Sequence, residues 1–108
     1  MSQIIDLNLL VPEDLQFKIG NDIYKIPTQP KYQKVLEFSV MQQKYAKTRN
    51  AQELEKALPE MVAFILNLDE EKSKMTAESV TQNLILPQMK IIMEKFTEEL
   101  QKTANDPN

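Results

Sequence analysis

Apolar and polar positions alternate in two short runs near the start of the chain, residues 15–19 and 23–26. Alternation with a period of two is typical of a half-buried strand, and the sequence Gly-Asn-Asp between the runs favours a tight turn. The turn lies either at Gly20-Asn21, as type II′, or at Asn21-Asp22, as type I′. Both alternatives place the same apolar side chains on one face of the predicted β-hairpin: Leu15, Phe17, Ile19, Tyr24 and Ile26.

This hairpin needs a cover, because a lone two-stranded ribbon is only marginally stable in water. Residues 5–11 also alternate mostly with a period of two and end at Pro12, which predicts a further strand. The N-terminal sheet is therefore expected to have two or three strands. Its apolar face must lie on helices, on the strand at 5–11 or on another protein, and the sequence leaves these alternatives open.

Beyond Pro30 the apolar pattern becomes that of helices. We expect a helix over residues 31–48, where neither Gly nor Pro occurs. A central, buried helix is predicted over residues 51–68, because apolar residues nearly encircle it. Pro59 should kink this helix or split it in two. A charged connection follows at residues 69–74.

Local start signals support these helices. Asn50 and Glu53 have the spacing of a capping box. Thr76 can cap a shorter helix that ends near Leu84. Pro87 suits the first turn of the last helix, because a proline there removes no helical hydrogen bond.

The whole chain is expected to form one domain of the α+β class, mainly α, in which an N-terminal β-hairpin precedes three to four helices. Residues 1–27 are expected to be β-rich and residues 31–102 to be helical. The polar residues 103–108 are expected to form a disordered tail. A chain of 108 residues suffices for one modest core.

The predicted helix at 31–48 carries two apolar stripes on roughly opposite sides. The first consists of Tyr32, Val35, Leu36, Ser39 and Val40, and the second of Phe38, Met41 and Tyr45. We predict that the second stripe binds a partner, and the alternative is that it packs under the hairpin. Methionine is favoured at adaptable binding surfaces, so Met89 and Met93 on the last helix are further candidates for partner contact.

The composition argues against catalysis. The chain contains no Cys or His and one Gly, so it lacks a thiolate, the usual general base and the glycines of a phosphate-binding loop. We therefore expect no enzymatic activity, no cofactor and no metal site. The first residues lack the basic region of a signal peptide, and no run approaches the ~20 apolar residues of a membrane span. A cytoplasmic protein is therefore expected.

Charge is unevenly distributed along the chain. Residues 31–49 carry five basic side chains against Glu37 alone, although the whole chain has a net charge of −3. This basic helix either presents a solvated face, pairs with acidic helices of its own fold, or attracts an acidic partner or phosphate. Nucleic acid is the least favoured partner, because the whole domain lacks a basic excess.

The hairpin contains a motif of the form F-x-I-G-x-x-x-Y-x-I-P, made by Phe17, Ile19, Gly20, Tyr24, Ile26 and Pro27. With only helices after it in a short acidic chain, the motif resembles the tail assembly chaperones of long-tailed bacteriophages and prophages. The resemblance implies a non-enzymatic protein of the bacterial host cytoplasm that binds the long, helical tape measure protein. Such chaperones keep this partner soluble until tail tube subunits polymerise around it. They often self-associate, and many are made in two lengths through a translational frameshift.

Two other interpretations compete with this one. The chain would also suit a different protein-binding adaptor, such as an inhibitor of a host enzyme or a secretion chaperone. A weak nucleic-acid binder that uses residues 31–49 is the less favoured alternative. The gene neighbourhood discriminates between them, because a tail assembly chaperone gene should lie between the tail tube and tape measure genes.

Overall fold

A hairpin followed by helices makes up the part of the chain that the computed structural model describes, residues 3–4 and 13–105. The strands are β1 (Leu15–Ile19) and β2 (Asp22–Ile26), and the helices are α1 (Tyr32–Lys47), α2 (Ala51–Leu66), α3 (Ala77–Asn83) and α4 (Leu86–Asn105). The predicted class, α+β and mainly α, is therefore confirmed, with four helices in the described residues. The predicted strand at 5–11 lies outside these residues.

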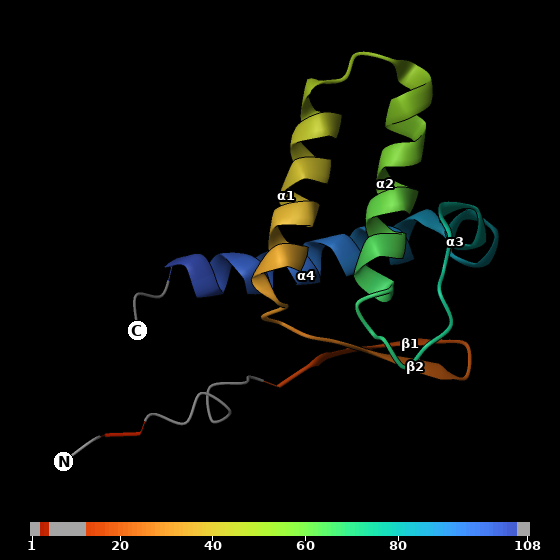
Figure 1. Cartoon of the computed structure of the whole chain (residues 1–108). Coiled ribbons are helices and arrows are strands. Elements are labelled where there is room, and N and C mark those ends of the chain that lie inside the picture. Colours follow the sequence, from red (N-terminus) through yellow and green to blue (C-terminus); the bar gives the residue numbers. More distant parts are fainter. Residues whose placement is uncertain (1–2, 5–12, 106–108) are drawn as a thin grey trace.

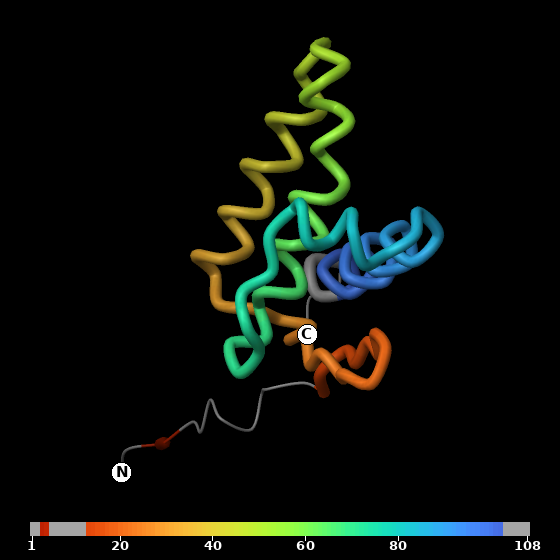
Figure 2. Tube along the Cα trace, turned by 90° about the vertical axis from the view of Figure 1, so that its right-hand side faces the viewer, coloured from red at the N-terminus to blue at the C-terminus, as the bar shows by residue number. Residues whose placement is uncertain are grey.

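The helices pack in two directions (Figure 1). α1 and α2 stand side by side, and α4 crosses near those ends of the pair that lie closest to the hairpin. In Figure 2 the hairpin and the tip of the α1–α2 pair lie on opposite sides of α4. α2 contacts α1, α3, α4 and β2, so it is the central helix, as its apolar pattern predicted.

The turn of the hairpin lies at Gly20-Asn21. Ile19 pairs with Asp22 across the two strands, which leaves two residues in the loop. Gly20 has a φ of 61° and is the one described residue with a positive φ. Because a type I′ turn needs a positive φ at both central residues, the turn is of type II′. The register places the predicted apolar residues together on one face of the hairpin.

The core forms between β2, α2, α3, α4 and one side of α1. Its large, fully buried side chains are Ile26, Phe38, Val62, Ile65, Leu66, Val80 and Phe96. Phe38 joins the helices through aromatic contacts: its ring centroid lies 5.8 Å from that of Phe64 and 5.2 Å from that of Phe96. The second contact is edge-to-face, a geometry that aromatic rings prefer.

Two helices begin at the predicted capping residues. The Asn50 side chain accepts hydrogen bonds from two backbone N–H groups of the first turn of α2, at 2.9 and 3.4 Å. Thr76 accepts from the backbone N–H of Ser79 at 3.1 Å. The Glu53 carboxylate accepts a hydrogen bond from the hydroxyl of Thr48. Both ends of the short α1–α2 connection are therefore held by side chains.

Three helix features differ from the sequence-based expectation. α2 ends at Leu66 and continues through Pro59, which is buried within it. A proline inside a helix removes one backbone hydrogen bond, and here the apolar burial of the helix offsets that cost. α4 reaches Asn105, three residues beyond its predicted end, and Lys102 in its last turn complements the helix dipole. Residues 106–108 of the predicted tail lie outside the described residues.

The connection between α2 and α3 holds the hairpin against the helices. The buried carboxylate of Asp69 accepts a hydrogen bond from the backbone N–H of Lys25 at 2.9 Å and from that of Glu71 at 3.1 Å. Lys72 adds an ion pair to Asp22 at 3.9 Å. The sequence predicted only a charged connection here, so this attachment of β2 is a finding of the structure.

Candidate partner-binding surfaces

The second predicted stripe of α1 faces the interior. Phe38 is 1% exposed and Tyr45 is 7% exposed, and Met41 is half-buried. The expectation that this stripe forms an open surface is therefore wrong for Phe38 and Tyr45. The physical reason is that this side of α1 packs on α2 and α4, where Phe38 meets the rings of Phe64 and Phe96.

The two methionines predicted for partner contact also belong to the interior. Met89 is buried and Met93 is half-buried, and both pack in the same apolar cluster as Phe38. Tyr45 lies further along α1 and donates a hydrogen bond to the carboxylate of Glu60 on α2. A partner that binds the folded chain therefore contacts other, exposed side chains.

The opposite side of α1 carries three exposed apolar side chains, which we call the α1 stripe. Tyr32 is 74% exposed, Leu36 is 48% exposed and Val40 is 65% exposed. They are spaced four residues apart, so they follow one another along a single ridge of the helix. The sequence showed both stripes of this helix, but helical periodicity alone does not say which of two stripes packs inward.

Basic side chains lie along α1 and directly beyond both of its ends. Lys34 pairs with Glu37 at 3.5 Å, and the Lys44 ammonium group lies 5.3 Å from the ring centroid of Tyr45. Lys31, Lys47 and Arg49, the remaining basic residues of this region, make no ion pair with a described residue.

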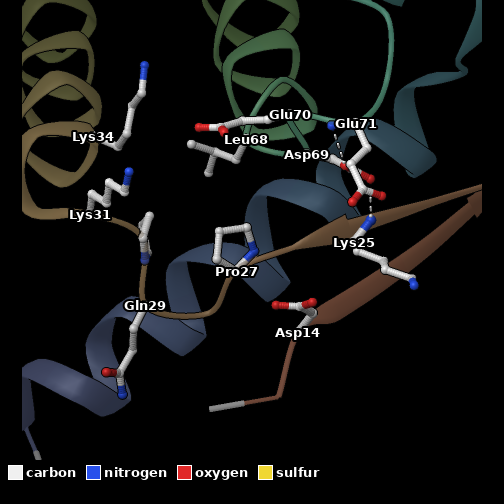
Figure 3. Close-up of a pocket in the computed structure, with 11 residues that line it drawn as sticks. Asp14, Lys25, Pro27, Gln29, Lys31, Lys34, Leu68, Asp69, Glu70 and Glu71 are labelled. Carbon is white, nitrogen blue, oxygen red and sulfur yellow. Dashed lines mark hydrogen bonds between the residues drawn. The ribbon is translucent and has the colours of Figure 1, made fainter. Parts of the chain in front are cut away.

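A cavity of about 580 Å³ lies beside the first turn of α1, and we call it the α1 notch. Figure 3 shows Lys31 and Lys34 on one side of it and Glu70 and Glu71 across from them, on the α2–α3 connection. Pro27 also lines the notch, as does Leu68. Cations and carboxylates thus face each other across an open cavity at the start of α1.

The α1 notch is suited to charged contacts with a polar segment. The Asp69 carboxylate in its wall already accepts two backbone hydrogen bonds. No group of three or more acidic residues in the described part of the chain has the arrangement of a metal site. The other charged residues that line the notch are Asp14, Lys25, Lys31, Lys34, Glu70 and Glu71.

A third feature is the hydrogen bond between Tyr45, in the last turn of α1, and Glu60 of α2. Burial of the phenol, the bond to Glu60 and the charges of Glu60 and Glu53 together raise the pKa of Tyr45 to about 12. Each of these effects disfavours the phenolate. The neutral phenol is therefore part of the folded state.

Replacing Tyr45 with Phe is expected to make the free energy of unfolding fall less steeply as the pH rises in the alkaline range. A tyrosine whose pKa is raised by folding supports stability fully below its unfolded pKa of 10.0, and this support is lost as the pH rises through about 12. Urea unfolding of both proteins between pH 9 and 12 (roughly the window set by these values) measures the difference. The pKa of Tyr24 is also raised, chiefly by burial. Because Tyr24 is present in both proteins, its contribution cancels in the comparison. If the free energy of unfolding changed equally with pH in both proteins, the effect could not be assigned to Tyr45.

A second exposed apolar region lies at the start of α4. Ile85, Leu86 and Ile91 are each more than half exposed. Beside them, a groove of about 190 Å³ separates α4 from β1. Its apolar lining consists of Phe17, Ile19, Leu84, Ile91 and Ile92. This groove and the α1 stripe lie on different elements of the fold.

Comparisons of this chain with protein-family models, with curated proteins and with solved structures found no match. Among the described helices, none combines the length and the apolar character that crossing a membrane requires.

Proposed function

We propose that this chain is a tail assembly chaperone of a long-tailed bacteriophage or prophage. It acts without catalysis, in the cytoplasm of the bacterial host, by binding amphipathic helices of the tape measure protein and keeping them soluble. The hairpin motif supplies the resemblance to that family. The observation that carries the proposal is the α1 stripe, an exposed apolar ridge on a basic helix.

The spacing of the α1 stripe suits a helical partner. Residues four apart on a helix form a ridge that packs into the groove between the equivalent ridges of a second helix. Tyr32, Leu36 and Val40 form such a ridge over two turns of α1. An aromatic residue within an apolar patch is also the usual centre of a protein interface.

The charges around the stripe favour a partner helix with acidic flanks. Lys31, Lys47 and Arg49 make no ion pair with a described residue, so they can meet carboxylates of a partner. Lys31 directly precedes Tyr32 in the sequence, and Lys47 and Arg49 lie at and beyond the C-terminal end of α1, so basic side chains provide a polar rim at both ends of the helix. Polar rims around an apolar centre give an interface its specificity more than its affinity.

A binding titration tests this proposal. The ligand is a helical fragment of the tape measure protein encoded in the same phage or prophage genome, and calorimetry measures its Kd. Replacing Leu36 with Ala is expected to weaken binding about tenfold, the loss typical of a well-placed interface residue. Because Leu36 is 48% exposed, thermal melting of the variant should stay close to that of the wild type.

Gln42→Ala is the matched control, because Gln42 is exposed on the same helix and lies away from the α1 stripe. Its Kd should stay within about twofold of the wild-type value. The proposal is wrong if the wild-type chain does not bind the fragment, or if Leu36→Ala and Gln42→Ala bind equally well. Nucleic-acid binding that persists at moderate salt would instead favour the alternative based on residues 31–49, because contacts to phosphate alone weaken steeply with salt.

A further inference from the structure

The two strands of the hairpin are covered unequally by the helices. On β2, the inward-facing residues Tyr24 and Ile26 are buried. On β1, Leu15, Phe17 and Ile19 face the same side of the sheet but are only half-buried. The apolar face of the hairpin is therefore partly open along β1, next to the groove between β1 and α4.

The backbone edges of the two strands also differ. In a hairpin with a two-residue turn, every second residue points its N–H and C=O groups away from the partner strand. Lys25 is such a residue of β2, and its N–H is taken up by Asp69 (Figure 3). The corresponding residues of β1 are Gln16 and Lys18. No hydrogen bond joins the backbone of either to a described residue outside the hairpin.

We propose that the open edge of β1 pairs with β1 of a second copy of this chain. The two strands run antiparallel about a twofold axis at Gln16 and complete a four-stranded sheet. This inference names a surface and a register for self-association, and it does not depend on the partner that α1 binds.

The charges on this edge are self-complementary in that register. A twofold axis at Gln16 places Lys18 of β1 opposite Asp14 of the second copy, the residue that directly precedes β1, and this pair occurs twice. Both side chains are exposed, and neither makes an ion pair with a described residue. An axis at Lys18 would set like charges opposite each other, which is unfavourable. An axis at Phe17 would set Lys18 opposite a neutral Gln16.

The same pairing also brings apolar side chains of the two copies into contact. Phe17 comes to lie opposite Leu15 of the second copy, and such aromatic–aliphatic pairs stabilise neighbouring strands. The second copy then extends the sheet along the groove that Ile91 lines, where Ile91 is 53% exposed. Pairing with another copy also removes an open strand edge, which soluble proteins generally protect.

Self-complementarity is the reason to choose a second copy over other occupants of the edge. Asp14 and Lys18 are equally spaced on either side of Gln16, so one strand supplies both halves of each charge pair. An unrelated extended peptide, or the residues 5–11 of the same chain, would have no need of this arrangement. Both would leave the protein without a dimer through β1.

Sedimentation of the full chain at low salt tests the proposal through charge reversal. Wild type is expected to dimerise as its concentration rises. Lys18→Glu places two carboxylates opposite each other at both ends of the paired edge, so its dimer should be roughly tenfold weaker or more. The double variant Asp14→Lys/Lys18→Glu exchanges the charges and should restore the dimer.

Lys56→Glu, on the exposed first half of α2, makes the same change in net charge and should leave dimerisation intact. Circular dichroism confirms that each variant folds, since both substituted side chains on the β1 edge are exposed. A monomeric wild-type chain at all concentrations overturns the proposal. So does a Lys18→Glu dimer as strong as the wild-type dimer, or a double variant that remains as weak as Lys18→Glu.

Discussion

Replacing Phe38 with Ala is expected to lower the free energy of unfolding by about 3–5 kcal/mol, the usual cost of removing a buried aromatic ring. Phe38 is 1% exposed and contacts the rings of Phe64 and Phe96. Truncation would leave a cavity between three helices, because packed neighbours relax only in part around a missing side chain. Urea unfolding measures this loss, provided that the slope of the unfolding free energy against urea concentration is the same in both proteins.

Leu36→Ala is the matched control for this prediction, because Leu36 lies on the same helix but on its exposed side. Its effect on unfolding should stay near 0.5 kcal/mol or below, in the range of surface substitutions. The pair of variants therefore separates the two stripes of α1 by their energies. Equal losses in Phe38→Ala and Leu36→Ala would show that the packing of α1 differs from the one described.

Replacing Asp69 with Ala is expected to cost about 1.5–3 kcal/mol, the range for hydrogen bonds to a charged group. The Asp69 carboxylate accepts from the backbone N–H of Lys25 at 2.9 Å and from that of Glu71 at 3.1 Å. The substitution would leave the Lys25 N–H without its acceptor at the edge of β2. Urea unfolding measures the global loss, and hydrogen exchange at the Lys25 amide should show faster local opening.

Two further variants sharpen this test. Asp69→Asn keeps one oxygen acceptor and should lose less stability than Asp69→Ala. Glu70→Ala, at an exposed neighbouring position, should leave both the unfolding free energy and the exchange at Lys25 nearly unchanged. If Asp69→Ala proved as stable as Glu70→Ala, the hairpin would have to be held by its apolar face and the Lys72–Asp22 ion pair instead.

The two proposed contact surfaces can be used at the same time. The α1 stripe lies on a helix that rises away from α4, whereas the hairpin lies on the other side of α4 (Figure 2). A dimer formed through β1 would therefore leave Tyr32, Leu36 and Val40 accessible on each copy. Such a dimer could present two ridges to one long helical partner, which raises the apparent affinity through effective concentration.

Local sequence signals determined most of the secondary structure. The alternation over residues 15–19 and the single glycine at Gly20 restricted the hairpin to two turn positions, and both predicted the same apolar face. Asn50 and Thr76 begin helices as expected, because a side-chain acceptor there meets N–H groups only two or three residues away. The donor and the acceptor of each of these hydrogen bonds lie only a few residues apart, so a short stretch of sequence contains both.

Only the tertiary structure decided which side of α1 is core and how the hairpin is attached. Periodicity defined two stripes on α1, but the inward one was set by the fit of Phe38 between Phe64 and Phe96, on two other helices. The hydrogen bond from Lys25 to Asp69 joins residues 44 positions apart, and no local pattern contains such a pair. The choice of an inward face and of a buried acceptor depends on neighbours that meet only after the chain has folded.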